Sequence, residues 1–134
     1  MHVITVKPEE VFQALTEPTR IRTACLLAMT SEESCLCELV DSLLEAQYKL
    51  SKHLKILKRA VLLTAENEGR FVYHRLVTEP RSHLRSLYNL VRALPGASKV
   101  YQNDLRRFRE RLCLREDGSC GVGIQSRELA MGID

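Results

Sequence analysis

Two cysteines separated by one residue, Cys35 and Cys37, are the residues of this sequence best suited to chemistry. Ser34 is placed to cap a short helix that begins with them, so both thiols should lie at the positive end of a helix dipole and ionise more readily. Residues two apart in a regular helix point about 200° apart, so joint chelation of one ion is expected to distort the first turn. Soft thiolates favour zinc, copper(I) or similar ions.

The other cysteines and the N-terminus indicate the redox environment. The chain has five cysteines, an odd number, and its first ten residues lack the features of a secretory signal. We therefore expect reduced thiols in a cytoplasmic protein, and Cys25 falls on the apolar face of its predicted helix, where it should belong to the core. For Cys35 and Cys37, thiol-based redox sensing and a purely structural role are alternative hypotheses.

A second group of residues is suited to binding phosphate. Between Ala46 and Arg59 there is no acidic residue, while five basic ones occur, Lys49, Lys52, Lys55, Lys58 and Arg59. Such a density is typical of a surface that contacts nucleic acid, and a solvated helix face is the alternative.

Length and composition limit the classes of protein. A chain of 134 residues, 45% hydrophobic and with net charge +3, favours one folded domain. No apolar run approaches the roughly 18 residues of a membrane span. The sequence has no phosphate-binding loop, nucleophile elbow or paired carboxylate motif, so we do not expect an enzyme. We expect a domain over residues 1–112 and a flexible tail containing Cys and Gly over residues 113–134.

The spacing of apolar residues predicts a mainly helical chain with one β-hairpin. A short helix from Cys35 separates the second and fourth helices. The other expected elements are helices over Pro8–Leu15, from Ile21 to Met29, over Gln47–Arg59, from Pro80 to Pro95 and from Ser98 to Cys113, with hairpin strands over Val61–Glu66 and Arg70–Val77.

This order of elements is that of a winged helix-turn-helix, with Gln47–Arg59 as the recognition helix. Four segments resemble, in order and spacing, the signatures of the ArsR/SmtB family of bacterial and archaeal repressors, which release DNA on binding metal or metalloid ions. They are Ala14–Arg22 (ALTEPTRIR), Ser34–Leu39 (SCLCEL), Leu50–Leu57 (LSKHLKIL) and Glu68–Leu76 (EGRFVYHRL).

The resemblance implies a homodimer that binds double-stranded operator DNA, with the first and fifth helices forming the dimer. The residues expected at the major groove or its phosphates are Gln47, Tyr48, Lys49, Ser51, Lys52, His53, Lys55 and, in the wing, Arg70. A winged-helix module that binds protein, without a response to metal, is the alternative from a different class.

The resemblance also implies a thiolate site at Cys35 and Cys37 for arsenite or antimonite, with cadmium, lead and zinc as alternative inducers. Arsenic-responsive members commonly carry a third cysteine three residues after the pair, where this chain has Val40. We expect the tail to supply the third thiolate, with Cys113 favoured over Cys120 because it adjoins an ordered helix and would lose less chain entropy. The alternative is that neither tail cysteine binds the ion and that two thiolates with solvent suffice.

Overall fold

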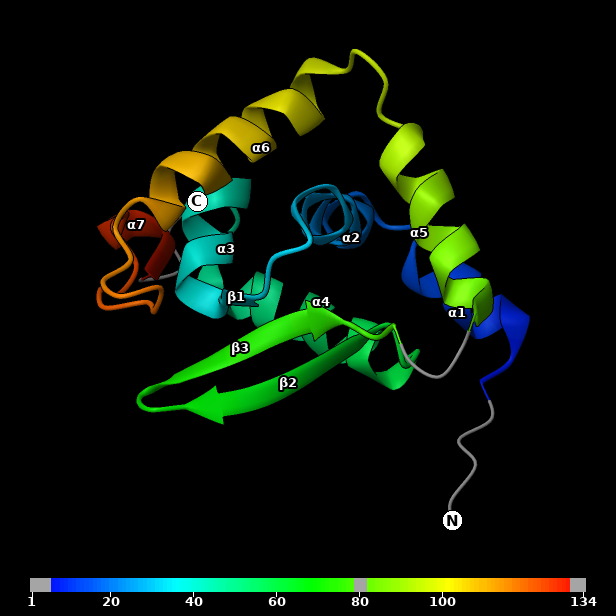
Figure 1. Ribbon diagram of the computed structural model, residues 1–134, viewed down its shortest axis with the longest axis horizontal. Helices are drawn as coiled ribbons and strands as arrows, with labels where there is room; N and C mark the ends of the chain where they lie inside the picture. The colour runs from blue at the N-terminus through cyan, green and yellow to red at the C-terminus, as the bar shows by residue number, and fades with distance from the viewer. Residues whose placement is uncertain (1–5, 79–81, 131–134) are drawn as a thin grey trace.

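The centre of the fold is three helices and a small sheet that follow one another in the chain. The computed structural model describes residues 6–78 and 82–130 (Figure 1). The central helices are α2 (Pro18–Thr30), α3 (Leu36–Leu43) and α4 (Gln47–Arg59). They are followed by a hairpin, here called the wing, made of β2 (Leu63–Glu68) and β3 (Phe71–Leu76). The winged helix-turn-helix expected from the sequence is therefore the observed arrangement.

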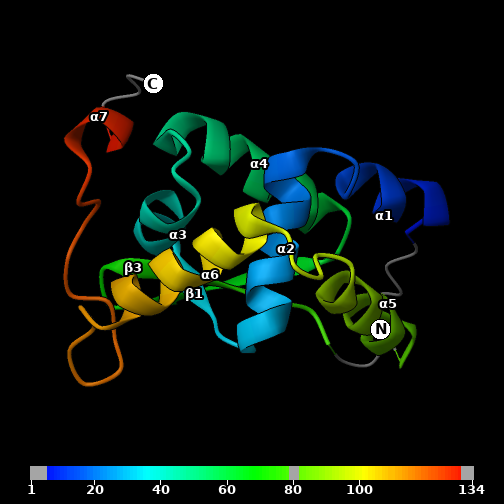
Figure 2. The same ribbon diagram turned by 90° about the horizontal axis from the view of Figure 1, so that it is seen from above.

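Four further helices surround this centre. They are α1 (Pro8–Ala14), α5 (Ser82–Ala93), α6 (Lys99–Leu112) and the short α7 (Arg127–Ala130). In both views α1 and α5 lie together at one end of the molecule, while α3, the end of α6 and α7 lie at the other (Figures 1 and 2). Within the described residues, no helix has the length and apolar character needed to cross a membrane.

The helix α4 has the same bounds as the predicted recognition helix, because its pattern is unambiguous. Leu50, Leu54 and Leu57 form a buried stripe at helical spacing and join the main core, which also contains Leu26 of α2 and Leu39 of α3. The basic residues fall mainly on the other faces. Burial of the leucine stripe therefore fixes which side of α4 is turned outward.

The start of α3 differs from the prediction. Ser34 and Cys35 form a short strand, β1 (Ser34–Cys35), which pairs antiparallel with β3 and makes the sheet three-stranded in the order β1-β3-β2. The helix begins at Leu36, and Cys35 rather than Ser34 is its N-cap. The prediction failed because pairing of Cys35 with Tyr73 depends on a strand 38 residues away, which local spacing does not reveal.

Other boundaries differ from the sequence prediction by a few residues. The first hairpin strand is shifted by two residues toward the turn, which Gly69 makes with φ +63°, and the second is one residue shorter at each end. The helix α1 ends at Ala14. Among the described residues the fifth helix begins at Ser82, and Pro80, expected to open it, lies outside them.

The described part of the tail packs against the domain. The side chain of Arg111 donates to the carbonyls of Val122 and Gly123 at 3.0 Å, and the amide of Gln125 donates to Asp41 at 3.1 Å. These bonds attach the described part of the tail, residues 113–130, to α3 and α6. Residues 131–134 lie outside the described part.

A buried carboxylate joins α2, α3 and α6. Asp104 is 1% exposed and accepts hydrogen bonds from Arg22 at 2.7 and 2.8 Å and from Arg107 at 2.8 Å. The two guanidinium groups also donate to the carbonyls of Leu43 and Ser42, at the end of α3. This network neutralises the charge of Asp104 and holds α6 on the helix-turn-helix.

Replacing Asp104 tests this role. In Asp104→Ala two guanidinium groups lose their buried partner, so we expect the free energy of unfolding to fall by about 2–3 kcal/mol, measured by urea denaturation. The matched control is Glu110→Ala, which breaks an exposed ion pair with Arg106 and should change stability by less than about 0.5 kcal/mol. Equal effects of the two substitutions would contradict the assignment.

Candidate functional site

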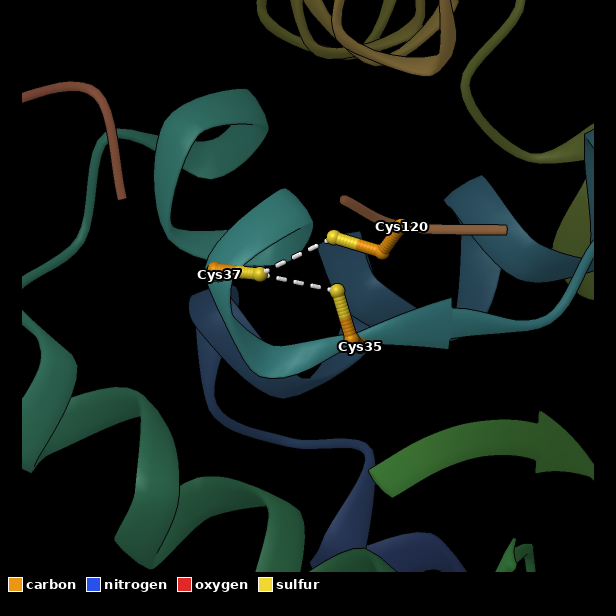
Figure 3. Close-up of side chains that lie close together, drawn as sticks. All are labelled: Cys35, Cys37 and Cys120. Atoms are coloured by element: carbon orange, nitrogen blue, oxygen red, sulfur yellow. Dashed lines mark hydrogen bonds between the residues drawn. The ribbon is translucent and has the colours of Figure 1, made fainter. Parts of the chain in front are cut away.

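Three cysteine thiols meet at the start of α3. The Sγ atoms of Cys35, Cys37 and Cys120, here called the thiol cluster, all lie within 4.8 Å of one another (Figure 3). The distance from Cys37 Sγ is 2.8 Å to Cys35 Sγ and 3.4 Å to Cys120 Sγ. All three residues are buried, at 1%, 8% and 6% exposure for Cys35, Cys37 and Cys120 respectively. The donor set fits a thiophilic ion, because three soft sulfur ligands converge in a site largely shielded from water.

The thiols of Cys35 and Cys37 converge because only one of them belongs to the helix. Cys35 has the extended conformation, with φ −82° and ψ 163°, and Cys37 lies in the first turn of α3. The angle of about 200° expected for two helical residues therefore does not apply. The geometric reason for expecting chelation to distort the first turn is therefore absent from the structure.

Glu38 fixes the position of Cys35. Its carboxylate is fully buried and accepts from the backbone N–H of Cys35 at 3.2 Å and from the hydroxyl of Ser34 at 3.3 Å. Arg115, in the tail, donates to both oxygens of this carboxylate at 2.7 and 2.8 Å. Burial opposes ionisation of Glu38, but Arg115 and the Cys35 amide hold its pKa below the usual value.

Cys120 is held over the other two thiols by the wing. The hydroxyl of Tyr73, in β3, accepts a hydrogen bond of 2.6 Å from the backbone N–H of Cys120. Tyr73 is 3% exposed and packs in one apolar cluster with all three cysteines, and the guanidinium of Arg115 lies 5.7 Å from the centre of its ring. Tyr73 and Arg115 were not singled out from the sequence, because they reach the cluster from distant parts of the chain; Tyr73 and Cys120 are 47 positions apart.

The close contact between Cys35 and Cys37 gives their two thiols different pKa values. A hydrogen bond from Cys35 lowers the pKa of Cys37 to about 6, against the opposing effect of burial, and the charge of Arg111 adds to the lowering. The same hydrogen bond and burial raise the pKa of Cys35. The expectation that both thiols ionise readily therefore holds for Cys37 alone.

The remaining two cysteines lie away from the thiol cluster. Cys113, which was favoured as the third ligand, is exposed after the end of α6 and its thiol donates to the carbonyl of Arg109 at 3.3 Å. The structure brings Cys120, not Cys113, to the Cys35–Cys37 pair. Cys25 is 1% exposed in an apolar cluster, and burial raises its pKa to about 11, which confirms its expected place in the core.

The residues expected at DNA differ in their exposure. Gln47, Tyr48, Lys52, Lys55 and the wing residue Arg70 are exposed, while Lys49, Ser51 and His53 are half-buried. The Lys49 and Lys52 ammonium groups lie 5.8 and 5.9 Å from the centre of the Tyr48 ring. Apart from His53, these side chains form a polar and basic surface on α4 and the wing.

His53 has contacts within the domain. Its Nδ1 lies 3.1 Å from a guanidinium nitrogen of Arg20 and 3.6 Å from a carboxylate oxygen of Glu17, both at the start of α2. The side chain is 20% exposed. These contacts support a packing role for His53 within the domain.

Comparisons with known proteins agree with this architecture. No protein-family model matches the chain. It is 38% identical over 74 residues to an arsenic resistance transcriptional regulator of Pseudomonas putida, which is 55% of this chain and 64% of that protein. It is 41% identical over 75 residues to the transcriptional repressor SmtB of Mycobacterium tuberculosis, 56% of this chain and 54% of that protein.

A third relative is an arsenical resistance operon repressor of Bacillus subtilis, 36% identical over 80 residues, which are 60% of this chain and 75% of that protein. The chain belongs to the ArsR/SmtB family of transcriptional regulators. ArsR/SmtB regulators are not enzymes. The chain spans 64% and 54% of the lengths of the first two relatives. The activity, ligands and partners of those ArsR/SmtB proteins therefore apply to this chain only as proposals.

The lowered pKa of Cys37 gives a test by alkylation. Because the thiolate is the nucleophile, the rate of iodoacetamide modification of Cys37 should rise with pH about a midpoint near 6. Cys35→Ala removes the hydrogen bond that lowers the pKa and should move the midpoint upward by about one unit or more. Peptide mass spectrometry at a series of pH values measures both. A midpoint unchanged in Cys35→Ala would contradict the stated cause.

Proposed function

We propose that this chain is a transcriptional repressor that binds operator DNA as a homodimer and releases it when the thiol cluster binds arsenite, antimonite or another thiophilic ion. One observation carries the proposal: three thiols from α3, its N-cap and the tail converge against β3, the central strand of the three-stranded sheet. Relatives named for arsenic and cadmium resistance support the choice of ligand class. Among the alternatives, cadmium, lead and zinc also suit sulfur ligands.

The contacts of the cluster give a route from the ligand to DNA. Cys35 pairs through its backbone with Tyr73, and Cys120 donates its N–H to the same tyrosine. Any displacement of these two cysteines therefore acts on β3, which continues to the proposed DNA contact Arg70. The proposal is that the wing and α4 lose their fit to the operator when the thiols rearrange around an ion.

The dimer would be formed at the opposite end of the molecule. Phe12 on α1 is 60% exposed and Leu90 on α5 is 54% exposed, and the two helices lie at the same end of the molecule (Figures 1 and 2). Exposed large apolar side chains at one end of a molecule are suited to a partner surface. A dimer through α1 and α5 would leave both thiol clusters and both α4 helices accessible.

A redox response of the same cysteines is a second candidate function. The thiolate of Cys37 lies 2.8 Å from Cys35 Sγ and 3.4 Å from Cys120 Sγ. It could attack a peroxide, giving a sulfenic acid and water, and a second thiol would then form a disulfide and release another water. DNA release by hydrogen peroxide, reversed by dithiothreitol, in a protein that ignores arsenite would favour this function.

Serine substitutions test the ligand set. Cys35→Ser, Cys37→Ser and Cys120→Ser should bind the operator but resist release by arsenite, whereas Cys25→Ser and Cys113→Ser should respond like the parent. Fluorescence anisotropy of labelled operator measures release. X-ray absorption of the arsenite complex should find three sulfur ligands in the parent and two in Cys120→Ser. Three sulfurs retained in Cys120→Ser, with two in Cys113→Ser, would move the third ligand to Cys113.

The proposed DNA surface is tested by the dependence of binding on salt. Lys52 is exposed on α4, and if it contacts a phosphate, Lys52→Ala should reduce the magnitude of the log–log salt slope by about 0.9 and weaken specific and non-specific binding alike. Arg85→Ala, on the exposed side of α5, is the matched control and should leave the slope unchanged. Equal slopes in the parent and Lys52→Ala would remove Lys52 from the interface.

A further inference from the structure

A buried guanidinium next to the thiol cluster has a donor that is not used. Arg111, at the end of α6, is 4% exposed, and its Nη1 has no hydrogen-bond partner among the described residues. Its Nε donates to the carboxylate of Asp41 at 2.6 Å, and its Nη2 donates to the carbonyls of Val122 and Gly123 at 3.0 Å. Leaving a donor of a buried charged group unpaired costs free energy, so the position of this charge needs a reason.

The carbonyl of Val122 places the guanidinium of Arg111 beside two of the thiols. This oxygen accepts from Nη2 of Arg111 at 3.0 Å, from the thiol of Cys120 at 3.2 Å and from the thiol of Cys37 at 3.5 Å. Hydrogen bonds from Cys35 and Cys120 and then the charge of Arg111 hold the pKa of Cys37 below its ordinary value. The guanidinium therefore acts electrostatically on the cluster.

The other charges near the cluster are compensated by their own partners. Arg115 donates to both carboxylate oxygens of Glu38 at 2.7 and 2.8 Å, so these two opposite charges largely cancel. The carboxylate of Asp41 is bonded to Arg111 but also accepts from the backbone N–H of Gln125 at 3.1 Å. Of these groups, Arg111 is the one that shares an acceptor atom with the thiols.

From this arrangement we propose that Arg111 determines how well the thiol cluster accepts divalent ions, a role that rests on the proposed function of the cluster. Divalent ions such as cadmium and lead leave the three thiolates with a net negative charge, which the guanidinium of Arg111 compensates. Arsenite leaves the site neutral and does not need this compensation. Arg111 is thus a specificity-determining residue that acts through its charge and not as a ligand.

The stoichiometry of binding gives the physical reason. A divalent cadmium ion displaces three thiol protons into solvent, and the resulting complex with three thiolates carries one negative charge. Arsenous acid, As(OH)3, forms three As–S bonds, and its three hydroxyl groups leave with the thiol protons as water, so the complex is neutral. Neither reaction changes an oxidation state. A net charge in a buried site is costly unless an opposite charge lies close to it.

The structural role of Arg111 is the same for both kinds of ion. When Cys37 and Cys120 lose their protons, their bonds to the carbonyl of Val122 are lost, whereas the bond from Arg111 remains. Arg111 therefore helps to keep this part of the tail at the cluster whichever ion binds. Only the charge of the complex distinguishes the two ions, so the ratio of their affinities isolates the proposed role.

Removal of the charge tests the proposal. In Arg111→Gln, which keeps an amide donor, affinity for cadmium should fall by about tenfold or more relative to affinity for arsenite. Arg111→Lys keeps the charge, and its ratio should stay within about threefold of the parent's. Competition with a chelator measures cadmium binding to the reduced full chain, and titration calorimetry measures arsenite. Arg109→Gln, on the exposed side of α6, is the matched control and should leave the ratio unchanged.

A double variant separates the loss of Arg111 from the exposure of Asp41. Arg111→Gln leaves the Asp41 carboxylate without its guanidinium, and this negative charge alone could disfavour an anionic complex. Combining Arg111→Gln with Asp41→Asn removes both charges. The cadmium-to-arsenite ratio should remain below the parent's by about threefold or more, because Arg111 lies beside the thiols. A ratio restored to the parent's value would assign the effect to Asp41 and overturn the proposal.

This inference and the proposed function fail in different ways. If Arg111→Gln lowers both affinities by the same factor, as detachment of the tail or partial unfolding would, or if Arg111→Lys behaves like Arg111→Gln, the charge does not select the ion and this inference is wrong. If arsenite binds the parent without releasing the operator, the proposed function is wrong, while the affinity ratios still decide the role of Arg111. A parent that binds neither ion would contradict both.

Discussion

The buried carboxylate of Glu38 is the interaction on which the site depends. It is a charge placed where water cannot solvate it, so it must be compensated by donors from the protein. Those donors come from two segments, the strand β1 through Ser34 and Cys35 and the tail through Arg115, while Glu38 itself belongs to α3. One carboxylate thus fixes the extended conformation of Cys35 and brings the tail to the helix that carries Cys37.

The elements that could be predicted from the sequence are those in which apolar residues repeat at a regular spacing. The leucine stripe of α4 and the alternating strands of the wing repeat along the chain, and both were located from the sequence, α4 with its observed bounds. The start of α3 was placed wrongly because the conformation of Cys35 depends on pairing with Tyr73. Local propensity carries no information about such a partner.

The candidate site, too, could be predicted only in part. The importance of Cys35 and Cys37 follows from their spacing, but the identity of the third nearby thiol depends on how the tail folds back. Chain entropy favoured Cys113, which adjoins α6, and did not account for the ion pairs of Arg111 and Arg115 that draw the tail onto α3. These ion pairs join residues 70 and 77 positions apart, beyond the reach of sequence spacing.

The hydrogen bond between Cys120 and Tyr73 affects how the ligand preference of such a protein could change in evolution. The donor is the main-chain amide, so any residue except proline can anchor the loop from position 120. A single codon change there could exchange sulfur for oxygen or for an imidazole nitrogen while the anchoring contact persists. A substitution at position 120 can therefore change the ligand preference with little effect on the stability of the fold. Selection can then act on these two properties separately.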